Sequence, residues 1–124
     1  MKKILVIDDE ADIREVLSTS LELTTDWKIE VASSGKEGIV KAIDSKPDAI
    51  VLDFMMPEMD GPTTARLLSA QPETASIPVV LLTAKPQMSD REQLMKNNGI
   101  KAILAKPFDP LTIGDEIKAA LGWS

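Results

Sequence analysis

The chain has 124 residues, a length that predicts one domain (residues 1–124). It has no cysteine and no histidine, which excludes disulfides, metal sites built on thiolates or imidazoles, and a Ser-His-Asp triad. Because nucleic-acid backbones repel negative charge, the net charge of −6 predicts no direct nucleic acid binding. No apolar run approaches the length of a membrane span and no signal peptide follows the N-terminus, so we expect a cytoplasmic protein with no membrane partner.

Short apolar runs alternate with amphipathic stretches, which predicts strands and helices in turn. We expect strands at residues 3–7, 27–31, 49–53, 79–83 and 102–105. We expect helices at residues 10–23, 35–43, 61–69, 90–98 and 110–121. Charged residues alternate with apolar ones in the second strand, a pattern typical of a half-exposed sheet edge. Strand-helix alternation at this spacing predicts right-handed crossovers and a parallel sheet with helices on both faces.

Local signals mark where several helices begin. The spacing Ser-x-x-Glu at residues 34–37 and 89–92 is a capping box, which predicts the starts of the second and fourth helices. Asp60 is expected to cap the third helix. Asp109 followed by Pro110 predicts a cap and a first helical position for the last one.

Polar residues stand where the apolar strands end. Asp8 and Asp9 follow the first strand, Asp53 closes the third, Thr83 closes the fourth and Lys106 follows the last. Open α/β sheets bind ligands at the carboxyl ends of their strands. If the first and third strands are neighbours, three carboxylates share one crevice, and Mg²⁺ would relieve their repulsion. Beside such an ion a carboxylate can act as nucleophile toward a phosphoryl group, and a lysine can neutralise a phosphoryl oxygen.

Each of these residues has a simpler explanation when it is taken alone. Asp8 or Asp9 could cap the first helix, and Asp53 could be a solvated strand end. Thr83 could be an ordinary β-branched strand residue, and Lys106 could be surface charge. All four explanations together require four coincidences at one sheet edge, so we favour the shared site.

At these positions the sequence resembles the receiver domain of two-component response regulators. The motifs that carry the resemblance are Val6-Ile7-Asp8-Asp9-Glu10, Asp53-Phe54-Met55-Met56-Pro57-Glu58-Met59-Asp60-Gly61, Leu82-Thr83-Ala84 and Lys106-Pro107-Phe108. The resemblance extends over essentially the whole chain. It implies a flavodoxin-like, doubly wound (βα)5 domain with the strand order 2-1-3-4-5.

The resemblance implies a role in metal binding for four residues. Asp9 would bind Mg²⁺ directly, and Asp8 would hold it through water. Asp53 and the backbone carbonyl of Met55 would complete the protein ligands.

The resemblance also implies a phosphorylation site. Asp53 would accept the phosphoryl group. Thr83 and the amide of Ala84 would hold its oxygens, and Lys106 would form an ion pair with them. The peptide bond before Pro107 would be cis.

The function implied is a phosphorylation-activated switch rather than an enzyme, apart from catalysis of its own phosphorylation and dephosphorylation. A sensor histidine kinase or a histidine phosphotransfer protein would donate to Asp53. The response would reach a protein target through the face formed by the fourth helix, fifth strand and fifth helix. The chain would be a monomer or a phosphorylation-dependent homodimer.

One position departs from the family pattern. Receivers usually carry Tyr or Phe three positions before the lysine, where this chain has Ile103. Isoleucine cannot copy the motion of an aromatic ring, so we expect coupling through Thr83, the following loop and the fourth helix, which has few apolar residues.

Two other functions stay open. A Mg²⁺-dependent phosphohydrolase working through an aspartyl phosphate would share the site. It usually needs a second acid where this chain has Met55. A phosphate-independent pseudo-receiver, a binding module with the same fold, is left open by Ile103.

Overall fold

The computed structural model describes residues 1–85, 91–97 and 99–123. Its strands are β1 (Lys3–Ile7), β2 (Lys28–Ala32), β3 (Ala49–Asp53), β4 (Val79–Thr83) and β5 (Ile100–Ala105). Its helices are α1 (Ala11–Thr24), α2 (Gly35–Ser45), α3 (Gly61–Ser69), α4 (Arg91–Asn97) and α5 (Ile113–Leu121). The strands pair in parallel in the order β2-β1-β3-β4-β5, which confirms the predicted flavodoxin-like topology.

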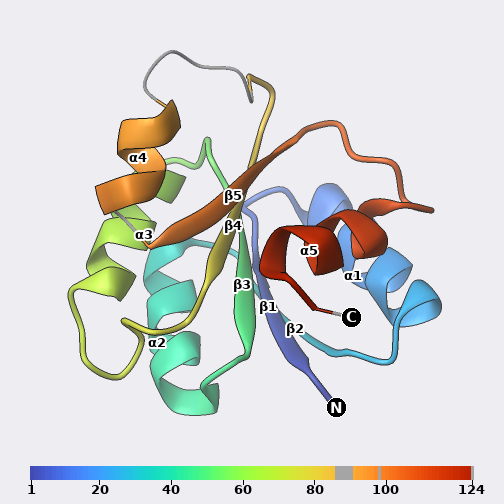
Figure 1. The fold of residues 1–124 in the computed structure, drawn as a ribbon, viewed down its shortest axis with the longest axis horizontal. Coiled ribbons are helices and arrows are strands. Elements are labelled where there is room, and N and C mark those ends of the chain that lie inside the picture. The colour runs from blue at the N-terminus through green and yellow to red at the C-terminus, as the bar shows by residue number, and fades with distance from the viewer. Residues whose placement is uncertain (86–90, 98, 124) are drawn as a thin grey trace.

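The sheet is covered by helices on both faces (Figure 1). Helices α1 and α5 lie on one face, and α2, α3 and α4 lie on the other. β3 and β4 are buried at every position, which explains why both read as unbroken apolar runs. β2 lies at an edge, as its alternating sequence predicted.

Two apolar cores lie between the sheet and its helices, and alternate strand residues enter each one. The core under α1 and α5 includes Ile4, Val6, Leu17, Leu21, Val51, Ile113 and Ile117. The core under α2, α3 and α4 includes Leu5, Ile7, Ile50, Leu52, Leu68, Leu81 and Ile103. Burying each such large aliphatic side chain contributes about 1.5–3 kcal/mol, so the sheet is a firm base for its loops.

Most of the predicted boundaries lie within two residues of the structure. β1, β3, β4 and α3 match, and Asp60 caps α3 by accepting the amide of Thr63. Ser34 likewise caps α2 by accepting the amide of Glu37. β5 begins at Ile100, earlier than expected, because a register shift opposite β4 adds a residue to its pairing. The capping box predicted at 89–92 begins outside the described residues.

The predicted start of the last helix is wrong. α5 begins at Ile113 rather than Pro110. The Asp109 carboxylate accepts the amide of Leu111, and the Asp109 carbonyl accepts the amides of Thr112 and Ile113. These bonds hold residues 109–112 in a turn, so Asp109 caps this turn instead of the helix.

Two tryptophans meet near the amino ends of β1 and β2. Trp27, which precedes β2, is 6% exposed and meets Trp123 edge to face, with 5.4 Å between the ring centroids. The Lys2 ammonium lies 4.6 Å from the centroid of the Trp123 ring. Gly122 (φ 71°) ends α5 in the left-handed region and allows the Trp123 amide to bond the Lys118 carbonyl.

Among the described residues, no helix combines the length and the apolar character that crossing a bilayer requires.

Candidate functional site

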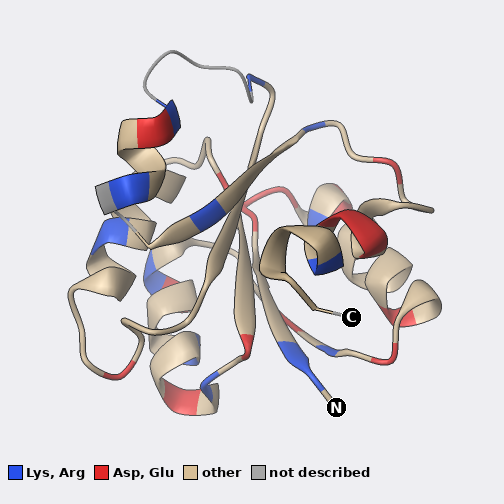
Figure 2. Cartoon of the chain, in the orientation of Figure 1, with Lys and Arg blue, Asp and Glu red and all other residues tan. Residues whose placement is uncertain are grey.

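The predicted acidic residues meet at the carboxyl end of the sheet. β1 and β3 are neighbours with Ile7 opposite Leu52, so the residues that follow each strand lie side by side. One carboxylate oxygen from each of Asp8, Asp9 and Asp53 lies within 4.8 Å of the others. In Figure 2 the acidic segments after β1 and at the end of β3 meet at the centre of this edge.

Asp8 is held by a bond at each polar group of its side chain. It is 1% exposed, its Oδ1 accepts the amide of Glu10 at 2.9 Å, and its Oδ2 accepts from the Lys106 ammonium at 3.2 Å. The residue at the cap position of α1 is Glu10, and its side chain makes no capping hydrogen bond. The alternative that Asp8 or Asp9 serves only to cap α1 is therefore wrong.

Lys106 joins two of the acids. Its ammonium lies 3.0 Å from Asp53 Oδ1 and 3.2 Å from Asp8 Oδ2, although β5 is two strands away from β3. The Lys106 amide donates to the Thr83 carbonyl at 2.8 Å, which fixes the start of the loop after β5 against the end of β4. The bond between Lys106 and Pro107 is cis, as predicted.

The site has more negative charge than its lysine can balance. Burial raises the pKa of Asp53, and the charges of Asp8 and Asp9 add to this effect, while the bond from Lys106 opposes it. Burial lowers the pKa of Lys106, but the bond to Asp53 and the charges of both acids outweigh burial and raise it. One lysine shared between two carboxylates, with a third beside them, leaves a place where an added cation is favoured.

The chemistry of the donors fits Mg²⁺. Asp9 Oδ1 is buried and accepts no hydrogen bond from any residue that the structure describes. A buried carboxylate oxygen without a partner is costly, and a bound cation would remove that cost. All three acids offer oxygen, which hard divalent cations prefer.

An apolar pocket of about 490 Å³ opens beside this cluster. It is lined by Glu10, Ile13, Val16, Asp53, Phe54, Met55, Thr83, Ala84, Lys106, Pro107, Phe108 and Pro110. The pocket thus brings the four predicted phosphorylation residues together. Met55 is 74% exposed at the pocket, and the part of its backbone carbonyl in metal binding stays a prediction.

Thr83 lies at the floor of the site rather than at the surface. It is 5% exposed, and its hydroxyl oxygen accepts the amide of Lys85 at 3.2 Å. That bond leaves the hydroxyl proton available to an acceptor in the pocket.

Two features were not anticipated from the sequence. Val16 follows the apolar periodicity of α1 together with Leu17, but it is 46% exposed and lines the pocket. Arg14 Nη1 donates to the Asp8 carbonyl at 2.8 Å. Because this bond joins a side chain to a backbone carbonyl, no signal in the sequence predicted it.

The position that departs from the receiver pattern is buried. Ile103 is 3% exposed in the core under α4, against which Leu94 and Met95 pack. An aliphatic side chain thus occupies the interior side of β5.

The family of receiver domains matches this chain. The model of the response regulator receiver domain matches residues 4–118. The DNA-binding dual master transcriptional regulator RpaA of Synechocystis sp. is 36% identical over 121 residues, covering 98% of this chain and 49% of that protein. The alkaline phosphatase synthesis transcriptional regulatory protein PhoP of Bacillus subtilis is 38% identical over 120 residues, covering 97% and 48%. The chain spans about half the length of these relatives.

Solved structures agree with the fold. The chemotaxis protein CheY4 of Vibrio cholerae superposes with a TM-score of 0.88 and 29% identity, covering 97% of this chain and 98% of that one. The receiver domain of the sensor histidine kinase PA1611 from Pseudomonas aeruginosa superposes with a TM-score of 0.83 and 26% identity, covering 98% of both chains. That structure is described with a magnesium ion coordinated in the active site cleft.

The expectation of no nucleic-acid partner is overturned. It rested on the net charge of these 124 residues. The relatives are transcriptional regulators, one of them named as DNA-binding, and this chain aligns with only about half of each. Charge is informative only about the surface that carries it, so an acidic domain does not exclude DNA binding by a regulator that contains it.

Proposed function

The chain belongs to the response regulator receiver domain family, and from this premise we propose that Asp53 accepts a phosphoryl group in a Mg²⁺-dependent reaction. Receiver domains are signalling switches rather than classical enzymes. The observation that carries the proposal is the cluster of Asp8, Asp9 and Asp53 within 4.8 Å, bridged by Lys106.

Mg²⁺ would be held by oxygen ligands at the acidic cluster. Asp9 would bind it directly, because its buried Oδ1 accepts no hydrogen bond. Asp53 and the Met55 carbonyl would add ligands, and Asp8, whose two oxygens already accept bonds, would act through water. The ion would supply positive charge that offsets the repulsion between a carboxylate nucleophile and a phosphoryl group.

The transfer needs an attacking oxygen and a donor. An Asp53 carboxylate oxygen forms a bond to phosphorus, and the bond between phosphorus and the donor imidazole nitrogen breaks, leaving the electron pair on that nitrogen. Lys106, Thr83 and the Ala84 amide hold the three oxygens of the group. Hydrolysis later returns the Asp53 carboxylate and inorganic phosphate.

The donor is a partner phosphohistidine, because the chain has no histidine of its own. A sensor histidine kinase or a histidine phosphotransfer protein supplies it. We place this exchange in the cytoplasm, with residues 1–124 acting as one receiver domain that is monomeric or dimerises when phosphorylated.

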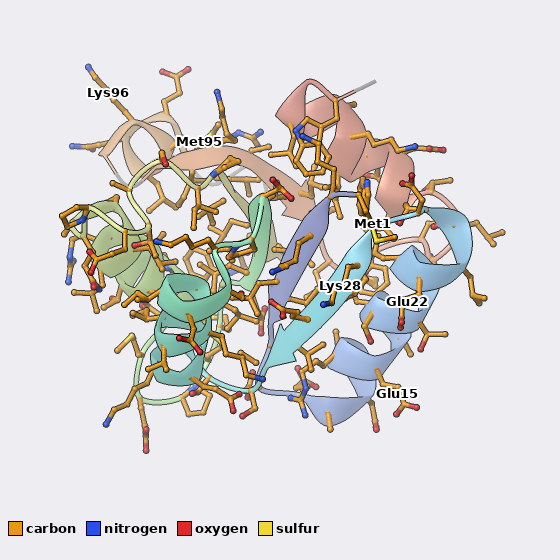
Figure 3. All side chains as sticks on the ribbon, turned by 90° about the horizontal axis from the view of Figure 1, so that it is seen from below. Met1, Glu15, Glu22, Lys28, Met95 and Lys96 are labelled. Carbon is orange, nitrogen blue, oxygen red and sulfur yellow. The ribbon has the colours of Figure 1, made fainter. Side chains whose placement is uncertain are left out.

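The response travels to the face formed by α4, β5 and α5. α5 is anchored by Ile113 and Ile117, which are fully buried, whereas α4 is held by the partly buried Leu94 and Met95. Figure 3 shows Lys96 extending from α4 into solvent while Met95 lies toward the sheet. Because α4 has the weaker anchor, we expect it to move, and near-complete switching requires about 5.5 kcal/mol of differential stabilisation.

The experiment is intact mass measurement after incubation with acetyl phosphate and Mg²⁺. We expect one added phosphoryl group, absent in Asp53→Ala and absent when EDTA removes the metal. Asp44→Ala, which removes an exposed acid on α2, is the matched control and should be labelled like the wild type.

Two outcomes separate the alternatives. Repeated turnover of a phosphate ester would favour a phosphohydrolase, although the exposed Met55 offers no acid to protonate a leaving group. No adduct with any donor would contradict the proposal and favour a pseudo-receiver.

A further inference from the structure

Arg14 connects α1 to the acidic loop that follows β1. Its Nη1 donates to the Asp8 carbonyl at 2.8 Å, and its own amide donates to the Glu10 carbonyl at 2.9 Å in the first turn of α1. The Arg14 side chain is half-buried, so its position is defined by packing as well as by the bond.

The bond reaches Asp9 through the peptide plane. The Asp8 carbonyl and the Asp9 amide belong to one rigid planar unit, so holding the carbonyl also sets the direction in which the chain enters Asp9. Asp8 is otherwise fixed by its amide on the Ala32 carbonyl and by its carboxylate on Glu10 and Lys106. Asp9 Oδ1 has no hydrogen bond that would fix its direction.

We propose that Arg14 is a positioning residue for the metal site, which holds the Asp8 carbonyl so that the Asp9 carboxylate is directed into the acidic cluster before an ion binds. This inference rests on the proposed function, because it concerns the same Mg²⁺ site. The residue acts through Asp8 and Asp9 and touches neither the ion nor the phosphoryl group.

A purely electrostatic role of Arg14 predicts the opposite effect on Mg²⁺ affinity. The charge of Arg14 reaches at least one nearby acid, because it contributes, after the bond from Ser33 and the charge of Lys41, to lowering the pKa of Glu37. If Arg14 acted only as a charge, its removal would strengthen cation binding, because a like charge near the ion would be gone. If Arg14 positions Asp9, its removal weakens cation binding despite that gain.

The test is Mg²⁺ affinity, measured by NMR titration of backbone amides in wild type, Arg14→Met and Arg66→Met. Arg66 is exposed on α3, so Arg66→Met loses the same charge away from the site. We expect about tenfold weaker Mg²⁺ binding for Arg14→Met, as is typical when support of a metal ligand is lost. Arg66→Met should keep the wild-type affinity.

Denaturant unfolding in EDTA checks that the variants are folded. If Arg14→Met does not fold, Arg14→Gln, which is also neutral and too short to reach in the same way, replaces it with the same expected loss. Equal or tighter Mg²⁺ binding in the folded Arg14 variant would overturn this inference alone. Failure of the wild type to bind Mg²⁺ would overturn the proposed function, and this inference with it.

Discussion

The two ends of the parallel sheet differ in how their charged groups are paired. At the amino end, the Lys3 amide donates to the Asp48 carboxylate, the Asp48 amide donates to the Lys3 carbonyl, and the Lys3 ammonium donates to the Ser45 carbonyl. At the carboxyl end, Asp8, Asp9 and Asp53 cluster together, Lys106 pairs with Asp8 and Asp53, and an Asp9 oxygen accepts no hydrogen bond from the described residues.

This difference indicates that the amino end contributes mainly to stability and the carboxyl end mainly to function. At the amino end, Trp27 packs against Trp123 and the polar groups of Lys3 and Asp48 bond to each other, so this end contributes to folding. The carboxyl end retains a surplus of buried negative charge, which costs stability and makes the site ready for a cation. Removing an acid at the carboxyl end should therefore raise the free energy of unfolding, whereas substitutions of the tryptophans at the amino end should lower it.

The largest effect is expected at the amino end. Trp27→Ala should lower the free energy of unfolding by about 3 kcal/mol, because a nearly buried indole leaves a cavity. Trp123→Ala should cost about 1 kcal/mol, since that ring is partly exposed and contributes mainly the edge-to-face and Lys2 contacts. Denaturant unfolding followed by circular dichroism measures both, and equal losses would contradict the description of this end.

At the carboxyl end, the lysine should be the stabilising partner. Lys106→Met should cost about 2 kcal/mol without metal, because the carboxylates of Asp8 and Asp53 lose their counter-charge. The pKa of Lys106 is raised above its ordinary 10.5, so its contribution is complete below that pH and is lost as pH rises through the raised value. Unfolding at neutral and strongly alkaline pH should show the two proteins converging; a constant difference would argue against an ionic contribution.

Removing an acid should have the opposite sign. Asp53→Asn should gain about 1 kcal/mol at neutral pH without metal, because the pKa of Asp53 is raised and its charged form is unfavourable in the folded state. A raised carboxyl pKa means that the folded protein holds the proton more tightly, so wild-type stability recovers as pH falls through that pKa toward 3.8. The advantage of Asp53→Asn should disappear over that range.

Asp44→Asn is the control for Asp53→Asn. Asp44 is exposed on α2, and Asp44→Asn should leave the free energy of unfolding close to that of the wild type. A gain equal to that of Asp53→Asn would point to net charge of the whole chain rather than repulsion at the site.

The fold could be predicted from the sequence because its main signals are local. β3 and β4 are unbroken apolar runs, and Asp60 and Ser34 cap the helices where they were expected. The start of α5 could not be predicted from the sequence. Asp109 accepts hydrogen bonds from the following amides in a turn, and it would accept similar bonds as a helix cap. Sequence patterns do not distinguish these two uses of one side chain.

The convergence of the candidate site residues could be predicted from the sequence, because the carboxyl ends of parallel strands meet at one edge of the sheet. The apolar pocket could not be predicted from the sequence. The periodicity of α1 places Val16 and Leu17 on one apolar stripe, but packing buries Leu17 and leaves Val16 exposed. The contact from Arg14 joins a side chain to a backbone carbonyl, and such a contact leaves no pattern in composition or spacing.

The central claim is that charge repulsion at the carboxyl end is relieved by Mg²⁺, and unfolding of wild type and Asp53→Asn with and without Mg²⁺ tests it most directly. At ten times its dissociation constant, Mg²⁺ should stabilise the wild type by about 1.4 kcal/mol, and at the same concentration it should stabilise Asp53→Asn by less than half as much. The advantage of the variant without metal should therefore shrink or reverse. Equal stabilisation of both proteins, or none of the wild type, would contradict the account.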